Sequence, residues 1–88
     1  MSQEETGHRL ESFVRKQFAV GAADTRFSRS AALFELGYVD SVGVVELLAF
    51  VREEFGVEIP DDDLLSEDFS TLDGIAGIVC RLAPQVAV

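Results

Sequence analysis

The segment LGYVDSVGVVELLAFVREEFGVEIP, residues 36–60, decides the fold because it contains the clearest helix of the chain. Asp40 is a residue type that caps helix N-termini, and Gly56 can take the left-handed conformation that ends a helix. An apolar stripe recurs between them at helical spacing and faces a core: Val44, Leu47, Leu48, Val51 and Phe55. The segment therefore predicts a helix from Ser41 to Phe55, followed by a short extended link over residues 57–60.

The same helix has a second apolar strip on another side. At about 100° per residue the strip begins beside Ser41. Its apolar members are Val42, Val45 and Ala49, and the acids just beyond them are Glu46 and Glu53. A bundle helix needs one buried stripe, so the strip is either a wider contact with a neighbouring helix or an exposed surface for a partner. The sequence leaves both interpretations open.

A helix is predicted on each side of this segment. Ser2 and Glu5 have capping-box spacing before an apolar stripe, which predicts a first helix from about Gln3 to Ala19, ended by Gly21. Towards the C-terminus, Ser70 or Thr71 caps a last helix that Pro84 stops. The expected core face of that last helix is Leu72, Ile75, Ala76, Ile78, Val79 and Leu82.

Two further stretches complete the prediction. Asp61–Glu67 forms a brief third helix with acids near its N-terminus. Residues 20–39 form a long connection, with a short helical turn over Ala31–Leu36 closed by Gly37. The expected apolar anchors of this connection are Phe27, Leu33, Phe34 and Leu36. No run shows sustained alternation of period two, so the predicted fold is all-α, with three main helices, a short third helix and a long first loop.

Size and composition exclude several classes of protein. The 88 residues suit one small domain, expected over 1–88 with its core at about 4–83. One Cys excludes an intramolecular disulfide, and one His argues against a catalytic triad or a zinc site. No apolar run approaches the roughly 20 residues that span a bilayer. With no signal peptide apparent, the sequence predicts a cytoplasmic protein without membrane insertion.

The net charge of −9 is concentrated in the middle of the chain. Residues 40–68 contain ten acids and one base, Arg52, whereas acids and bases balance on either side. Such a charge repels phosphate backbones and anionic membranes, so nucleic-acid binding is not expected. The acidic stretch is either a solvated face or a docking surface for basic partners.

Ser41 is better explained as a modification target than as a nucleophile. A serine nucleophile needs a base. The one imidazole, His8, lies between polar neighbours on the first helix and is expected to be solvated. Cys80, inside the last helix, is expected to be a small residue near the core.

The residues from Leu36 to Pro60, with Asp40-Ser41-Val42, Val45-Glu46-Leu47 and Phe55-Gly-Val-Glu-Ile59-Pro60, resemble acyl and peptidyl carrier proteins. The resemblance extends over about residues 4–83 and implies a four-helix carrier-protein bundle. It implies that Ser41 bears a covalent 4′-phosphopantetheine arm from coenzyme A and that Asp40 is its recognition neighbour. The partner-facing candidates that it implies are Val42, Val45, Glu46, Ala49 and Glu53.

The resemblance also implies a set of partners and a non-catalytic role. A phosphopantetheinyl transferase would add the arm, and an adenylating ligase or acyltransferase would load an aminoacyl, peptidyl or acyl group as a thioester. Condensing, transferring or tailoring enzymes would then act in trans on a monomeric carrier. Gly43 replaces an acid common in fatty-acid carriers, and Arg52 stands where a carboxylate is common. Both departures favour a dedicated carrier of a specialised, natural-product type of pathway, similar to aminoacyl or D-alanyl carriers.

Three alternatives remain open from the sequence. The chain could be an acidic helical interaction module without cargo, although the intact neighbourhood of Ser41 argues against it. A small enzyme would need an acid and a base together, and the carboxylates have the pattern of a solvated face. Within the carriers, a fatty-acid or D-alanyl carrier is the alternative subtype.

Overall fold

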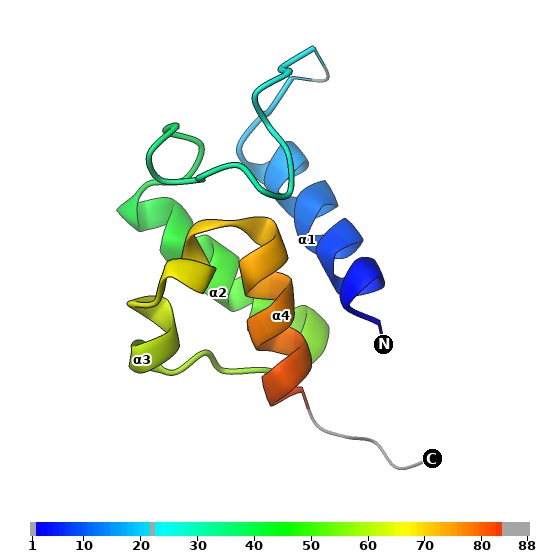
Figure 1. The fold of residues 1–88 in the computed structure, drawn as a ribbon, viewed down its shortest axis with the longest axis vertical. Helices are drawn as coiled ribbons and strands as arrows, with labels where there is room; N and C mark the ends of the chain where they lie inside the picture. Colours follow the sequence, from blue (N-terminus) through cyan, green and yellow to red (C-terminus); the bar gives the residue numbers. More distant parts are fainter. Residues whose placement is uncertain (1, 22, 84–88) are drawn as a thin grey trace.

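The computed structural model describes residues 2–21 and 23–83, and within them all regular structure is helical. The elements in chain order are α1 (Gln3–Gln17), α2 (Ser41–Phe55), α3 (Asp61–Leu64), the 3₁₀ helix η1 (Glu67–Ser70) and α4 (Leu72–Leu82). Three main helices, a short third helix and a long first connection confirm the all-α prediction (Figure 1). The 3₁₀ turn before α4 was not anticipated, because Asp61–Glu67 was expected to form one helix.

The first helix begins where predicted and ends earlier than expected. The Ser2 hydroxyl accepts a hydrogen bond from the Glu5 backbone N–H at 3.1 Å. The helix stops at Gln17, and Ala19 takes a left-handed conformation with φ of 53°. The Val20 N–H then bonds the Arg15 carbonyl at 3.0 Å, the six-to-one bond of a glycine-type helix ending. Ala19 therefore performs the role expected of Gly21, at some steric cost.

The second helix has the bounds that its caps predict. Its C-terminal residue is followed by Gly56 in the left-handed conformation, with φ of 69°. Side chains join α2 to α1: the Phe13 and Phe50 rings stack with centroids 4.1 Å apart. Arg9 also pairs with Glu54 at 2.7 Å.

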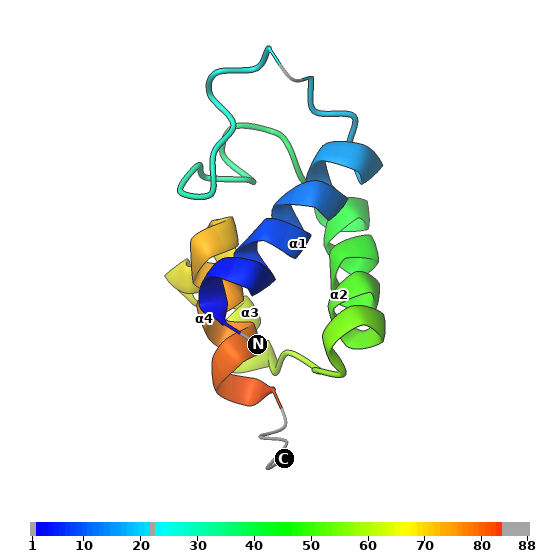
Figure 2. The same ribbon diagram turned by 90° about the vertical axis from the view of Figure 1, so that its right-hand side faces the viewer.

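One core joins the three main helices to the first connection. The α1 and α4 helices pack directly against each other (Figure 2). Leu47 of the expected core stripe is completely buried. The α1, α2 and loop contributions to the buried core are Leu10, Val14, Leu47, Val51, Phe27, Leu33 and Val39. The α4 contribution is Leu72, Ile75, Ala76, Ile78 and Val79, as the apolar face predicts, while Leu82 is half-buried.

The connection over residues 20–39 covers one end of the helices (Figure 1). One prediction about it is confirmed and one is wrong. The short helical turn is present, since the Leu36 N–H bonds the Ala32 carbonyl at 3.0 Å, and Gly37 closes it in the left-handed conformation with φ of 81°. Phe34 and Leu36 are exposed, so Phe27 and Leu33 are the buried anchors.

The region between α2 and α4 contains a short α-helix and a separate 3₁₀ turn, whereas the sequence predicts one helix over Asp61–Glu67. The third helix ends at Leu64, where the Ser66 hydroxyl bonds the Asp63 carbonyl at 2.6 Å. Thr71, rather than Ser70, caps α4, since its hydroxyl accepts from the Gly74 N–H at 3.0 Å. The predicted stop at Pro84 lies outside the described residues.

Gly74 allows η1 and α4 to meet, which gives a stability prediction. A methyl group at Gly74 would overlap the Asp68 carbonyl oxygen, whereas one at Gly77 would meet Gln3 at an ordinary 3.6 Å. We expect Gly74→Ala to lower the free energy of unfolding by about 1–3 kcal/mol through the forced backbone shift. The matched Gly77→Ala should raise it by about 0.5–1 kcal/mol through helix propensity. Chemical denaturation measures both, and equal effects would contradict the assigned contact.

Candidate functional site

Ser41 is the first residue of α2, and its side chain is exposed. Asp40 precedes it in an extended conformation, and its Oδ1 accepts a hydrogen bond from the Gly43 N–H at 2.8 Å. The predicted cap is therefore confirmed. Because the cap carboxylate turns back over the helix end, the Ser41 hydroxyl is left open to solvent at the start of the helix.

The loop before Ser41 is held by contacts on three sides. The Tyr38 hydroxyl donates to Asp24 Oδ2 at 2.8 Å, and the Tyr38 ring packs edge-on against Phe27 at 5.1 Å. Removal from solvent raises the pKa of Tyr38, and the bond to Asp24 raises it further; the same bond lowers the pKa of Asp24. Val39 is buried beside the capping residue. The segment leading into the site is thus fixed by both polar and apolar contacts.

Gly43 has a packing role that sequence reasoning missed. It is buried, and a Cβ there would come within 2.8 Å of the Phe18 ring and 3.1 Å of the Val39 side chain. A side chain at position 43 would therefore require the Phe18 ring and the Val39 side chain to shift. Gly43 was interpreted as a marker of carrier subtype, and this contact accounts for the glycine independently of subtype.

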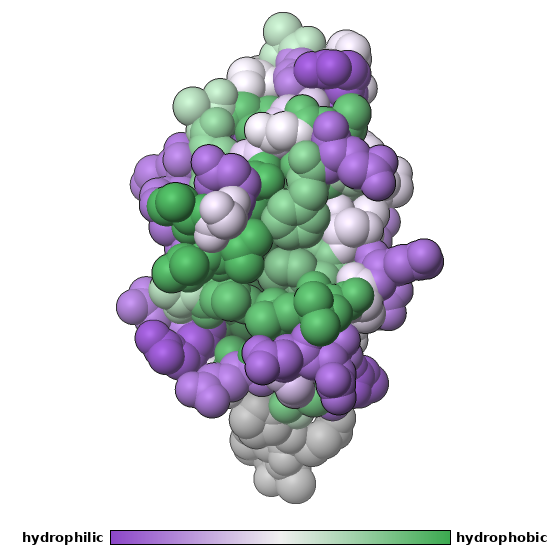
Figure 3. Space-filling view, turned by 90° about the vertical axis from the view of Figure 1, so that its left-hand side faces the viewer, coloured by the Kyte–Doolittle hydropathy of each residue, from purple (hydrophilic) through white to green (hydrophobic). Residues whose placement is uncertain are grey.

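Two members of the second apolar strip are on the surface. Val42 is 66% exposed and Val45 is 67% exposed, which decides against their being a wider core contact. Ala49 is half-buried. The face presented by α2 and α3 is apolar in its middle and hydrophilic at its edges (Figure 3). Leu65, which follows α3 and is 87% exposed, belongs to the exposed apolar residues that sequence reasoning missed.

The two acids beside the strip differ in their surroundings. Glu46 is half-buried, and its Oε2 accepts a hydrogen bond from Gln17 Nε2 of α1 at 2.7 Å. Glu53 is exposed. The structure therefore places Glu53 freely at the surface and ties Glu46 partly to the bundle.

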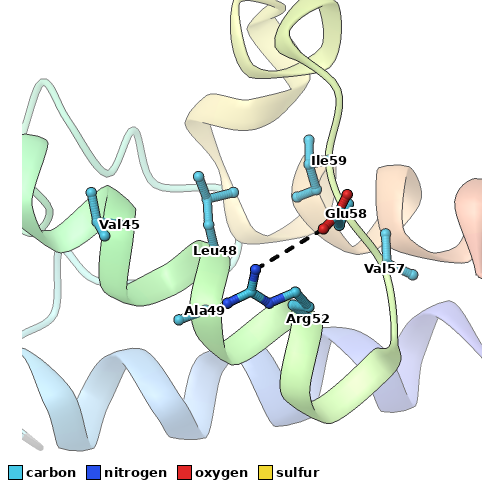
Figure 4. A pocket seen from close by; sticks show the side chains of 7 residues that line it. All are labelled: Val45, Leu48, Ala49, Arg52, Val57, Glu58 and Ile59. Carbon is cyan, nitrogen blue, oxygen red and sulfur yellow. Dashed lines mark ion pairs between the residues drawn. The ribbon is translucent and has the colours of Figure 1, made fainter.

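A groove of about 330 Å³ lies along α2, next to the strip (Figure 4). One wall comes from α2 and the other from the extended link that follows it. The lining residues are Val45, Leu48, Ala49, Arg52, Val57, Glu58 and Ile59. The link was predicted only as a connection. The apolar residues Val57 and Ile59 in the link were the sequence signal that it packs beside α2.

Other possible centres are not supported by the described part of the chain. His8 is exposed, as expected. The half-buried Cys80 has its sulfur 3.5 Å from the Thr6 hydroxyl, inside the bundle. Among residues 2–21 and 23–83, no three His, Cys, Asp or Glu side chains are grouped as metal ligands. In the same ranges, every helix is too short or too polar to cross a membrane.

The start of α2 suits a phosphodiester-linked arm. The Ser41 hydroxyl is exposed and free of the capping contact, which Asp40 makes with its own carboxylate. The positive end of a helix dipole is a favourable place for a phosphate anion. Fold and site together define a small helical domain with an exposed serine at the start of its second helix.

Comparison with known proteins gives the family. The family model described as a phosphopantetheine attachment site matches residues 9–79. The probable acyl carrier protein PigG of Serratia sp. (strain ATCC 39006) is 32% identical over 74 residues, which cover 84% of each chain. The acyl carrier protein of Zymomonas mobilis subsp. mobilis (strain ATCC 31821 / ZM4 / CP4) is 37% identical over 60 residues, covering 68% of this chain and 74% of its own. The chain belongs to the phosphopantetheine-dependent carrier protein family.

Membership confirms the general role that the sequence predicted. Carriers of this family are non-catalytic and hold a covalent 4′-phosphopantetheine arm. They work with a phosphopantetheinyl transferase and with biosynthetic enzymes. The carrier therefore presents cargo, and bond making and breaking belong to its partners.

The Asp40 cap can be separated from the charge of Asp40. Asp40→Ala removes the acceptor for the Gly43 N–H and should lower the free energy of unfolding by about 1 kcal/mol. Asn caps helices about as well as Asp, so Asp40→Asn should stay within a few tenths of a kcal/mol of the parent. Chemical denaturation of the three proteins decides this. A large loss in Asp40→Asn would show that the charge, rather than the cap, stabilises the site.

Proposed function

We propose that Ser41 is the attachment residue of the arm and that the protein carries an aminoacyl, peptidyl or acyl group on it as a thioester. The observation that carries the proposal is the exposed hydroxyl at the first residue of a helix whose cap is supplied by the preceding Asp40. The carrier is a single domain over 1–88 with its core at about 4–83. It is a cytoplasmic monomer that acts in trans, without nucleic-acid binding or membrane insertion.

The geometry of the site supports a separate role for each of its residues. Asp40 holds the first turn of α2 and leaves the Ser41 hydroxyl in solvent, where a transferase can reach it. The N-terminus of α2 would stabilise the negative charge of a phosphate attached to Ser41. The arm supplies a thiol, and Val42, Val45, Ala49, Glu46 and Glu53 present a surface over which enzymes dock. Weak docking suits this task, since cargo has to pass from one enzyme to the next.

The partners and pathway are the finer part of the proposal. A phosphopantetheinyl transferase adds the arm, an adenylating ligase or acyltransferase loads the cargo, and condensing, transferring or tailoring enzymes use it. We favour a specialised pathway of the nonribosomal peptide or polyketide kind, such as antibiotic biosynthesis. The exposed Arg52 on α2 supports this, because it stands where a carboxylate is common in the resembled family. Both relatives above are named acyl carrier proteins, which favours an acyl cargo. A fatty-acid or D-alanyl carrier is the alternative subtype.

The attachment site is tested by mass. Incubation of the unmodified protein with coenzyme A and a broad-specificity phosphopantetheinyl transferase should add one phosphopantetheine to the parent. Ser41→Ala should gain none, because its side chain has no hydroxyl. An interaction module without cargo would leave the folded parent unmodified across several transferases. Gain on Ser41→Ala would place the arm elsewhere.

The docking role of the acids is tested at Glu53. Glu53→Lys should slow cargo transfer from a partner with a basic docking surface by about three- to tenfold at low salt, and the difference should shrink at high salt. Glu53 is exposed, so the melting curve should hardly change. Glu53 is a cleaner choice than Glu46, whose bond to Gln17 would break as well. Equal transfer rates at low salt would exclude Glu53 from docking.

A further inference from the structure

Arg52 interrupts the charge pattern of the proposed docking face. It is the one base among residues 40–68, beside ten acids. Arg52 follows Ser41 by eleven residues, which is about 16 Å along the helix axis and within about 20° of the same side. An enzyme that covers the Val42–Ala49 strip to reach an arm on Ser41 must therefore place some part of its surface over Arg52.

The guanidinium is available to such a surface. Its ion pair with Glu58 spans 4.0 Å, and the two side chains are 64% and 83% exposed. An exposed pair at that distance holds its partners weakly. Arg52 lies at the edge of the apolar groove, with Ala49 one turn before it and Glu58 across from it (Figure 4). Its N–H donors can thus meet a partner without breaking a strong contact.

The helix dipole favours Arg52 but does not explain the whole charge pattern of the last turn of α2. A cation in the last turn of α2 is favourable to the helix dipole. The two residues that follow in the same turn are Glu53 and Glu54, which have the opposite and unfavourable sign. At 100° per residue, Arg52 and Glu53 lie at opposite edges of the strip, and Glu54 lies away from it. Opposite charges therefore stand at the two edges of the strip, and Arg52 is at the edge that borders the groove.

We propose that Arg52 is a specificity-determining residue of this face. It repels enzymes that place a lysine or arginine over the groove and accepts those that place a carboxylate there, while the neighbouring acids and valines contact basic and apolar groups. Discrimination by a repulsive charge needs no tight binding. The inference rests on the proposed function, because it requires an arm on Ser41 and docking along α2.

The experiment uses a partner of known charge as its probe. A purified malonyl-CoA acyltransferase of fatty-acid synthesis is chosen for a lysine- and arginine-lined docking surface. Its kcat/KM for malonyl transfer is measured with the arm-bearing parent, Arg52→Gln and Arg52→Glu at low and high salt. We expect Arg52→Glu to raise kcat/KM about tenfold at low salt, Arg52→Gln to fall between, and salt to reduce both gains.

Lys16→Glu is the matched control. It makes the same change of net charge at an exposed residue of α1, beside Phe13 and Phe50 on the other side of α2. It should leave kcat/KM nearly unchanged. An equal gain in Lys16→Glu would attribute the effect to net charge and overturn the proposal, as would no gain, or no detectable transfer, in Arg52→Glu.

Two further measurements distinguish a failure of the Arg52 proposal from a failure of the proposed function. Intact mass before the assay shows whether each variant bears the arm; failure of the parent to accept it overturns the proposed function as well. Replacing the acyltransferase lysine or arginine that docks over the groove by glutamate should restore transfer to the parent and remove the advantage of Arg52→Glu. If this reversal leaves the order of the variants unchanged, Arg52 does not act through that contact.

Discussion

The close approach of α2 to the end of α1 at Gly43 is the constraint on which the site depends. The Phe18 ring and the Val39 side chain fill the space that a side chain at position 43 would need. This contact fixes the first turn of α2 against the bundle. The residues of the same turn that point away, Ser41 and Val42, are thereby directed into solvent. Packing at Gly43 and the Asp40 cap together leave the proposed attachment hydroxyl exposed.

Most of the helical framework could be predicted from the sequence because its signals are local. Caps at Ser2, Asp40 and Gly56 are set by hydrogen bonds or dihedral angles within a few residues, and these predictions were confirmed. What depended on distant partners could not be predicted. The bond between the Leu33 N–H and the Ser70 carbonyl, which joins the first connection to the end of η1, is one example.

The candidate site likewise has features that are set within one helix and features that depend on contacts between elements. The place of Ser41 at a helix start and the existence of a second apolar strip could be predicted from a motif and a helical wheel, since both are properties of one helix; the exposure of Val42 and Val45 needed the structure. The tie between Glu46 and Gln17 needs the packing of α1, and the groove needs the path of the link after Gly56. Gly43 is the most instructive case. A residue interpreted through family resemblance is favoured by a contact with an aromatic ring that no local pattern reveals.

The second helix thus has to satisfy two demands on one short segment. Its inner stripe, with Leu47 and Val51 completely buried, provides core stability, while Val42 and Val45 remain in water at some cost in solubility. The surrounding acids keep the molecule dispersed by mutual repulsion and can also attract basic enzymes. A surface of apolar residues and like charges attracts many partners indiscriminately. One opposite charge, Arg52, at the far end of this surface and three turns from Ser41, can make that attraction selective without making it strong.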